Sequence, residues 1–218
     1  MKLMIFDTET TGLLDYKADL MEKHQPRVMQ LACKLVEEDT GEVIKEMCRI
    51  AKPDNWPALE DGAFKAHGIS IQRCHDEGVP MKEILEEFHE IKRLAERRTG
   101  FNVSYDKRMM KREELIYEMR TEADHLHTFC IMQISKDICQ IPPTNSMMKA
   151  GRKTFKTPNL TEAYTHFFGR GFNKAHDAMA DVNATLEIFF KLKEMGKIPD
   201  KPEAPASDAL SDVLSGAA

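Results

Sequence analysis

The sequence lacks the features of a membrane or secreted protein. No apolar run approaches the roughly 18 residues of a membrane-spanning helix, and the N-terminus shows no signal-peptide pattern. The five cysteines are odd in number, scattered, and form no C-x-x-C pair. We therefore expect reduced thiols that serve as packing residues in a cytoplasmic protein with no membrane partner.

The sequence also lacks the positive charge that is common in nucleic-acid-binding proteins. Its formal net charge is −5, which by itself is a mild argument against such a partner. However, the residues after Pro199 hold four acidic residues against one lysine, a net of −3, which leaves −2 for residues 1–199. The body of the protein therefore need not repel a polyanion.

Length and composition indicate one folded domain followed by a tail. The 218 residues are 42% hydrophobic and 31% charged, which is ordinary for a protein with a sizeable core. We expect residues 1–197 to form the domain. Residues 198–218 are rich in Pro, Ala, Ser and Asp, and we expect them to be a flexible acidic tail.

Apolar runs and turn residues predict an α/β fold with a mixed sheet. The first three strands follow one another directly and should be antiparallel. Later strands alternate with helices and should pair in parallel, with the helices flanking the sheet. The expected strands are 3–7, 28–36, 42–50, 99–103 and 126–132.

Helical periodicity and capping residues predict four main helices. Apolar residues recur every three or four positions after Pro80, which suits a helix start. Ser104 can cap a helix, and Asn159 and Glu162 have the spacing of a capping box. The expected helices are 80–98, 104–119, 160–168 and 177–195, and residues 140–157 should be irregular.

The most informative segment lies at the end of the first strand. Asp7 and Glu9 are spaced i and i+2, so both carboxylates should project from the same face of the strand. Adjacent carboxylates repel and are costly to desolvate, and Mg²⁺ or Mn²⁺ would remove that cost. Thr10, Thr11 and Gly12 would form a turn that a substrate can approach closely. Alone, the segment is also consistent with an acidic surface turn.

Two further carboxylates and a histidine are candidates for the same site. Asp106 should lie in the first turn of a helix, where an aspartate can also simply complement the helix dipole. Asp181, between Ala180 and Val182, needs a metal or a cationic partner in such apolar surroundings. His176 precedes the same helix and is either a mobile general base or a surface histidine.

The order D-x-E, N-x-x-x-D and H-x-x-x-x-D resembles the three motifs of the DEDDh, or DnaQ-like, 3′–5′ exonucleases. This family of the ribonuclease-H-like superfamily includes the proofreading epsilon subunit of bacterial DNA polymerase III, ribonuclease T, oligoribonuclease and the TREX enzymes. The resemblance covers about residues 1–193. It is carried by segments 6–12, 67–69, 160–164 and 175–178.

The resemblance implies a ribonuclease-H-like fold, two Mg²⁺ or Mn²⁺ ions and a role for each candidate. His176 resembles the general base. Main-chain groups of Thr10 and Thr11 would meet the terminal 3′-hydroxyl, and Leu13 would help to frame the terminal base. The implied metal ligands are Asp7, Glu9, Asp106 and Asp181, with Asp7 shared between the ions. The implied substrate-binding residues are Thr10, Thr11, Leu13, His67, Gly68, Ile69 and Asn102.

The second motif departs from the usual family pattern. Gly100-Phe101-Asn102 stands where the family usually has alanine-histidine-asparagine, and Tyr105 precedes Asp106. Asn102 is kept. Phe101 can alter how the terminal nucleotide stacks, so the departure bears on substrate preference more than on catalysis.

Basic residues are expected near the site in two clusters. A basic loop with an aromatic residue suits a flexible single strand, although ordinary solvated lysines would give the same pattern. The first cluster is Lys107, Arg108, Lys111 and Arg112. The second is Lys149, Arg152, Lys153 and Lys156, interleaved with Phe155.

The expected activity is metal-dependent 3′–5′ hydrolysis of single-stranded 3′ ends, with DNA favoured over RNA and nucleoside 5′-monophosphates as products. A DNA polymerase is the expected setting for a proofreading role. Three alternatives stay open: an exoribonuclease of the same family, a phosphatase with an aspartyl nucleophile, and a non-catalytic nucleic-acid-binding module. The phosphatase would need an aspartate where Glu9 stands.

Overall fold

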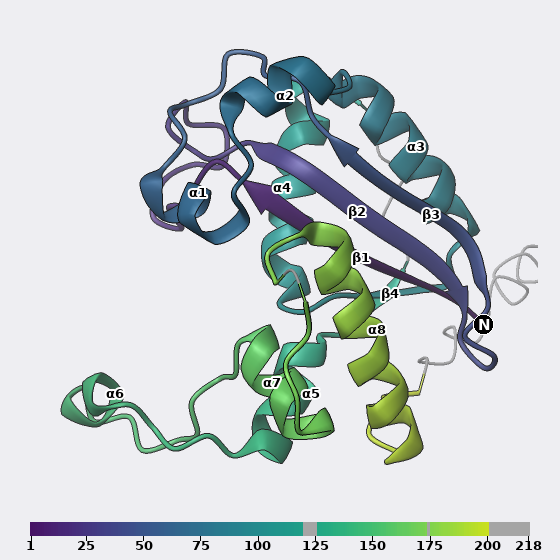
Figure 1. Cartoon of the computed structure of the whole chain (residues 1–218), viewed down its shortest axis with the longest axis vertical. Helices are drawn as coiled ribbons and strands as arrows, with labels where there is room; N and C mark the ends of the chain where they lie inside the picture. Colours follow the sequence, from purple (N-terminus) through teal and green to yellow (C-terminus); the bar gives the residue numbers. More distant parts are fainter. Residues whose placement is uncertain (120–125, 174, 201–218) are drawn as a thin grey trace, which may run out of the picture.

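The computed structural model describes residues 1–119, 126–173 and 175–200. Within these ranges five strands form one sheet in the order β3-β2-β1-β4-β5, flanked by eight helices (Figure 1). β1, β2 and β3 pair antiparallel, whereas β4 is parallel to both β1 and β5. The expected α/β fold with a mixed, ribonuclease-H-like sheet is confirmed. The strands are β1 (Lys2–Thr10), β2 (Val28–Glu37), β3 (Val43–Ile50), β4 (Arg97–Thr99) and β5 (His127–Thr128).

Strand β1 is central because its first half is apolar on both faces. Leu3, Met4, Ile5 and Phe6 are at most 1% exposed, as is typical of a strand covered on both sides. Because successive side chains of a strand point to opposite faces, these residues enter two cores. Met4 and Phe6 lie in one core, and Leu3 and Ile5 lie in the other. The polar second half of β1, beginning at Asp7, therefore emerges between two packed layers.

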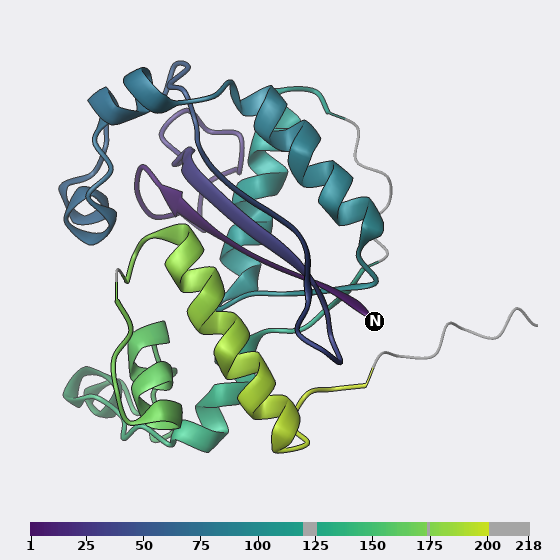
Figure 2. The same ribbon diagram turned by 45° about the vertical axis from the view of Figure 1, so that its right-hand side comes forward.

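Two groups of helices cover the two faces of the sheet (Figures 1 and 2). Helices α3 and α4 pack on the face of Met4 and Phe6. Helix α8 packs on the opposite face and also contacts α7, which lies beside α5. The bounds are α3 (Met81–Leu94), α4 (Val103–Ile116), α5 (Ile131–Cys139), α7 (Leu160–Phe168) and α8 (Ala178–Glu194).

Three short helices lie in the connections, namely α1 (Asp61–His67), α2 (Ile71–Glu77) and α6 (Asn145–Lys149). Helix α2 was not expected from the sequence, and the Ser70 hydroxyl caps it by accepting the Arg73 N–H at 3.0 Å. Helix α6 lies in the segment expected to be irregular. Residues 140–157, called the arm below, project away from the sheet in Figure 1.

The expected boundary between helix and strand at residues 80–103 is wrong. The helix ends at Leu94, and β4 occupies Arg97–Thr99 instead of 99–103. Arg97 is only 1% exposed, donates to Glu38 Oε1 at 2.8 Å and lies 4.6 Å from the Phe129 ring centroid. A buried arginine with distant partners looks in sequence like one more polar helical position.

The strand expected at 126–132 is also shorter than predicted. Only His127 and Thr128 pair in the sheet, because Ile131 already begins α5. Helix α4 begins at Val103, one residue before Ser104, and ends at Ile116 rather than 119. The expected helices at 160–168 and 177–195 are confirmed, together with the capping box of Asn159 and Glu162.

The end of the described chain contacts the domain. Ile198 is partly buried against the core beneath α8, and the Pro199 carbonyl accepts a hydrogen bond from Arg97. Most of the tail expected at 198–218, namely residues 201–218, lies outside the described residues. Among the described helices, none is long and apolar enough to cross a membrane.

Candidate active site

Two helices bring carboxylates to the polar end of β1 from opposite faces of the sheet. Asp106, in the first turn of α4, accepts hydrogen bonds from Thr8 N–H at 3.0 Å and Thr8 Oγ1 at 2.7 Å. Asp181 lies in the first turn of α8, which covers the face of Asp7 and Glu9. Since Thr8 lies between Asp7 and Glu9, the four acids converge on one strand end.

Gln30 fixes the start of α8 beside Glu9. It is the register partner of Glu9 on β2 and is 4% exposed. Its Oε1 accepts the Ala178 N–H at 3.1 Å, and its Nε2 donates to Asp177 Oδ2 at 3.5 Å. Asp177 also caps α8 by accepting the Ala180 N–H at 3.2 Å. Sequence reasoning missed Gln30, whose partners are nearly 150 residues away.

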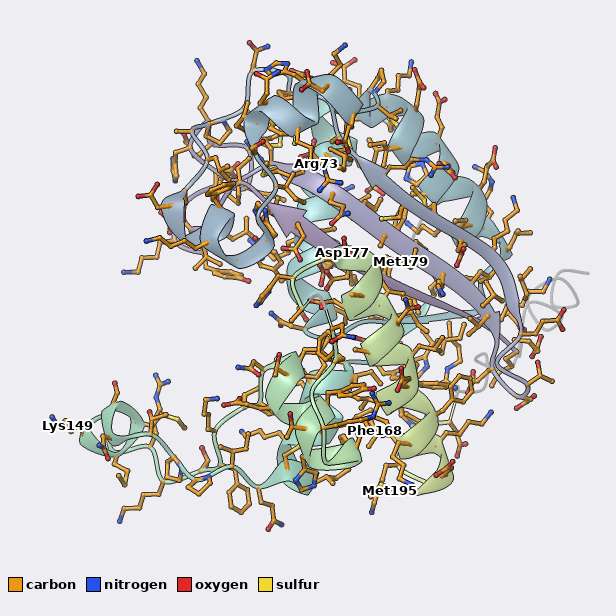
Figure 3. All side chains as sticks on the ribbon, in the orientation of Figure 1. Arg73, Lys149, Phe168, Asp177, Met179 and Met195 are labelled. Carbon is orange, nitrogen blue, oxygen red and sulfur yellow. The ribbon has the colours of Figure 1, made fainter. Side chains whose placement is uncertain are left out.

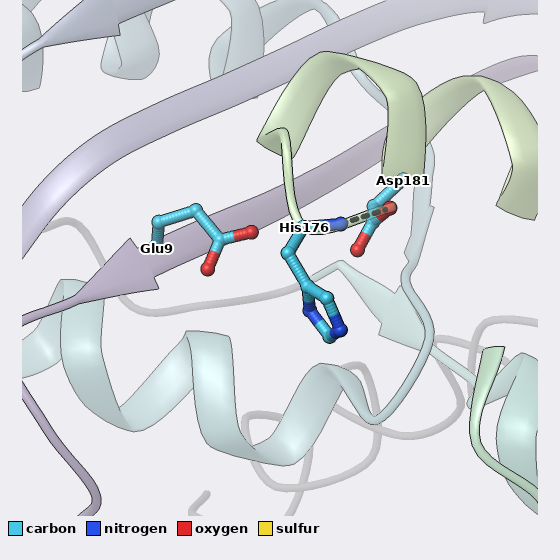
Figure 4. Close-up of side chains that lie close together, drawn as sticks. All are labelled: Glu9, His176 and Asp181. Carbon is cyan, nitrogen blue, oxygen red and sulfur yellow. Dashed lines mark hydrogen bonds between the residues drawn. The ribbon is translucent and has the colours of Figure 1, made fainter. Parts of the chain in front are cut away.

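His176 lies immediately before α8 in a left-handed conformation, with φ of 67°. Its main-chain N–H donates to Asp181 Oδ1 at 3.2 Å, while its side chain is exposed (Figure 4). Ligand-capable atoms of Glu9, His176 and Asp181 lie within 4.8 Å of one another. The backbone is thus held against Asp181, while the exposed imidazole lies near both Glu9 and Asp181.

Burial, and after it repulsion between carboxylates, raises the pKa of the four acids. Burial raises the pKa of Glu9 to about 8, with Asp181 adding the next largest contribution. Burial also raises the pKa of Asp7 well above its usual range, followed by repulsion from the other three acids. The pKa of Asp106 rises to about 7 and that of Asp181 to about 6, again through burial first, against hydrogen bonds that lower both.

This set of groups fits divalent cations. The carboxylates supply only hard oxygen ligands, which Mg²⁺ and Mn²⁺ prefer. In their ionised form they also carry more negative charge than the surroundings stabilise, as the raised pKa values of Asp7 and Glu9 indicate. A bound cation would favour the ionised form of every one of them. The site can therefore hold metal with the residues that it contains.

Tyr105 fixes the turn that follows β1. Its hydroxyl lies 2.7 Å from Thr10 Oγ1 and donates to the Gly12 carbonyl at 2.9 Å. Thr10 Oγ1 also donates to that carbonyl at 2.8 Å. From sequence, Tyr105 was noted only as a departure from the family pattern, because no local signal links it to a turn more than 90 residues earlier.

The loop of His67, Gly68 and Ile69 is bonded to the same turn. His67 Nδ1 accepts the Ile69 N–H at 2.9 Å, so Nε2 carries the proton and donates to the Thr10 carbonyl at 3.2 Å. Burial lowers the pKa of His67, which favours this neutral form. Gly68 has a φ of 68° and ends α1. Ile69 is 2% exposed and packs with Met29, so it anchors the loop.

The two candidate residues after Thr10 differ in availability. The Thr11 N–H donates to the Arg27 carbonyl at 2.9 Å, and the Thr11 carbonyl accepts the Glu60 N–H at 2.8 Å. Both main-chain groups of Thr11 are therefore already hydrogen-bonded within the protein, and their expected contact with a 3′-hydroxyl stays a prediction. Leu13, in contrast, is 78% exposed at the mouth of the turn.

The expected basic clusters are only partly available to a ligand. Arg112 is 4% exposed and donates to the carbonyls of Pro26 and Leu20, so it belongs to the interior. Arg108 lies 5.2 Å from the Tyr16 ring centroid and lines a groove together with Lys111. Asn102, with φ of 65° at the start of α4, lines a second groove beside the arm.

Comparisons with known proteins identify the family and the fold. A family model described as Exonuclease (RNase T) matches residues 4–189. No curated protein matches the chain. The chain is similar to a structure of E. coli exonuclease I in complex with a dT13 oligonucleotide, at 18% identity and a TM-score of 0.67 over 88% of this chain and 41% of that one.

Two further structures show the same likeness. The zinc-bound complex of E. coli exonuclease I with single-stranded DNA has 18% identity and a TM-score of 0.66, covering 89% of this chain and 40% of that one. Exonuclease I from Methylocaldum szegediense has 18% identity and a TM-score of 0.65, covering 88% of this chain and 40% of that one. This chain spans about two fifths of their length, and at such identity the likeness shows the fold. Because the family model covers most of the sequence, the chain belongs to the RNase T, or DnaQ-like, family of 3′–5′ exonucleases, which are hydrolases.

Proposed function

We propose that the protein hydrolyses the 3′ end of single-stranded DNA one nucleotide at a time and releases nucleoside 5′-monophosphates. The observation that carries the proposal is the convergence of Asp7, Glu9, Asp106 and Asp181 on one strand end, with His176 beside them. Exonucleases of this family use divalent metal ions. The oxygen ligands make Mg²⁺ or Mn²⁺ the proposed pair of ions.

Each acid has a proposed place in holding the ions. Asp7, Glu9 and Asp181 would bind one ion, and Asp7 and Asp106 would bind the other. Two such ions, when bound, stabilise the attacking and leaving oxygens of an in-line displacement at phosphorus. The Thr8 hydrogen bonds to Asp106 and the His176 N–H bond to Asp181 orient these carboxylates before any ligand arrives.

His176 is the proposed general base. Its imidazole accepts a proton from the water that attacks the phosphorus, because neutral imidazole can take up a proton near neutral pH. The bond from phosphorus to the ribose 3′-oxygen breaks, and that oxygen takes up a proton. The products are a nucleoside 5′-monophosphate and a strand with a new 3′-hydroxyl. Water is the nucleophile, so no covalent intermediate with the protein forms.

The preference for DNA is supported by the likeness to exonuclease I, whose structures contain single-stranded DNA or an oligo-dT. An expected likeness to the polymerase epsilon subunit, and with it a polymerase partner, stays a prediction from the sequence. RNA trimming is the competing activity, because both activities share the same phosphodiester chemistry.

The test compares DNA and RNA oligomers of one sequence, each labelled at its 5′ end. We expect a ladder of shortened DNA products and free nucleoside 5′-monophosphates with Mg²⁺ or Mn²⁺, and neither with EDTA. Asp7→Asn should abolish the reaction. Asp137→Asn removes a charge from an exposed residue of α5 and should leave the rate unchanged. Faster degradation of RNA than of DNA would make RNA the substrate. Activity in Asp7→Asn would refute the assignment of the active site.

A further inference from the structure

The arm, residues 140–157, carries charge of one sign. It contains four basic residues and no acidic residue, although the whole protein has a net charge of −5. Lys149 lies at the end of α6, and Arg152 and Lys153 follow it. Such a concentration of positive charge on an acidic protein marks a surface for a polyanion.

The charges of the arm face solvent. Lys149, Arg152 and Lys153 are exposed, and Phe155 beside them is 40% exposed. Figure 3 labels Lys149 on the part of the arm that extends from the body. Lys156, at the base of the arm, differs from these three because it is bonded to Glu162 Oε1 at 2.6 Å. The outer part therefore presents cations together with an exposed aromatic ring.

The base of the arm adjoins the candidate active site. Lys156 and Thr157 line a groove of about 580 Å³ together with Phe101 and Asn102. Asn102 immediately precedes α4, whose first turn carries Asp106. A hydrogen bond of 2.8 Å from Lys156 N–H to the Ile141 carbonyl holds the two ends of the arm together. The groove at the base of the arm thus lies beside the start of the helix that carries Asp106.

We propose that the arm binds the substrate strand on the 5′ side of the cleaved nucleotide, with its cations on phosphates and Phe155 stacked on a base. Cations and aromatic rings are the combination by which proteins bind single strands of any sequence. About nine residues out and nine back limit the reach of the arm to roughly 30 Å. The inference rests on the proposed function, because it assumes a 3′ end in the site.

The test measures binding of two fluorescent oligo-dT strands, a short one of about five nucleotides and a long one of about twenty, in EDTA so that neither is hydrolysed. The arm variant is Lys149→Ala/Arg152→Ala/Lys153→Ala. The control variant, Lys82→Ala/Lys92→Ala/Arg93→Ala, removes the same charge from α3. Phe155→Ala tests stacking separately.

We expect the arm variant to bind the long strand at least tenfold more weakly at about 0.1 M salt. The slope of log Kd against log salt should be lower by about 2, because each of three phosphate contacts on a single strand contributes about 0.7. The arm variant should bind the short strand as tightly as the wild-type protein does. The control variant should bind the long strand as tightly as the wild-type protein does. With metal present, kcat/KM should fall for the long strand alone.

Wild-type affinity and salt slope in the arm variant would overturn the inference, as would equal losses in the control variant. A change of oligomeric state in the arm variant, measured by size-exclusion chromatography, would make the arm an interface between copies and also overturn it. Failure of the proposed function has a different signature, because the wild-type protein would then hydrolyse neither strand with metal present. Replacing residues 143–154 by a short Gly-Ser turn provides an independent variant, since the Ile141–Lys156 hydrogen bond already joins the ends.

Discussion

At the scale of single residues, the site holds groups whose charges oppose one another. Asp7, Glu9 and Asp181 are held together by a buried strand and a packed helix, so they cannot move apart to reduce their repulsion. The folded protein therefore contains an electrostatic repulsion between carboxylates that a bound cation can relieve.

The first prediction concerns His176→Ala. The four carboxylates remain, so metal affinity, measured by calorimetry, should survive. Hydrolysis should slow by roughly 10²–10⁴-fold, the usual contribution of a general base, with much less change in substrate affinity. Loss of metal affinity in the variant, with hydrolysis otherwise intact, would make His176 a ligand instead of the base.

The second prediction concerns stability against pH without metal. The folded-state pKa of Glu9 is about 8 and that of Asp106 about 7, whereas unfolded carboxyl groups titrate near 4. Between about pH 5 and 8 the folded protein therefore binds more protons than the unfolded protein, and stability should fall as pH rises. Urea unfolding in EDTA measures this fall, which should be shallower in Asp106→Asn.

Metal should reverse that trend, because the ions bind the ionised carboxylates of the folded state. A concentration about one hundred times the Kd should raise the melting temperature by on the order of 5–10 °C. The increase should be larger at pH 8 than at pH 5. An equal increase at both values, or none, would contradict the assignment of these four acids as ligands.

At the scale of elements, a buried ion pair joins α4 to the turn after β1. Arg27 and Glu113 are 4% and 0% exposed, and Arg27 Nε and Nη2 donate to Glu113 at 2.9 Å. Glu113 Oε1 also accepts the Val28 N–H at 3.0 Å. The Arg27 main chain bonds to Thr11, so the pair supports the turn as well as the core.

Glu113→Gln should destabilise the protein by about 3–5 kcal/mol, because it leaves the buried Arg27 with only the more distant, partly exposed Asp54 carboxylate at 3.9 Å. Denaturant unfolding measures the loss. The matched control is Glu77→Gln, which removes the carboxylate of an exposed pair with Arg73 and should cost at most about 1 kcal/mol. Similar small losses in both variants would mean that the buried pair does not hold α4 in place.

The elements that local patterns define could be predicted from the sequence, and those defined by distant contacts could not. The period of apolar residues and the capping box placed α7 and α8 correctly. Strand β4 was placed at 99–103 instead of Arg97–Thr99, because Arg97 and Arg98 owe their burial to distant partners such as Glu38, 59 residues from Arg97. For the same reason Arg112 was expected on the surface and lies inside.

The candidate site shows the same division. The i and i+2 spacing of Asp7 and Glu9 is a local pattern, and so are the helix starts at Asp106 and Asp181. The sequence therefore predicted the strand or helix on which each of these acids lies. The bonds that position them are not local. Thr8 to Asp106 and Gln30 to Ala178 each join residues about a hundred or more positions apart.

At the scale of the whole molecule, the first residues of the expected tail contact the domain. Ile198 packs on the core and the Pro199 carbonyl accepts from the buried Arg97. A chain that stops after Asp200 should therefore keep wild-type melting temperature and hydrolysis of short oligomers. A chain that stops after Lys197 should lose about 1–3 kcal/mol, the cost of removing the partner of a buried donor. Thermal unfolding of the two truncations measures the difference, and equal stability would mean that Arg97 does not depend on Pro199.

The projecting arm also has a consequence for handling the protein. Lys149, Arg152 and Lys153 are exposed within a segment held mainly by its own short helix and turn, which is where proteases cleave folded proteins. Brief treatment with trypsin should therefore cut the arm first and leave two fragments that stay associated because α8 packs on β1 and β2. An oligonucleotide bound along the arm should slow this cleavage, so the rate of nicking reports occupancy of the arm without any need for hydrolysis or metal.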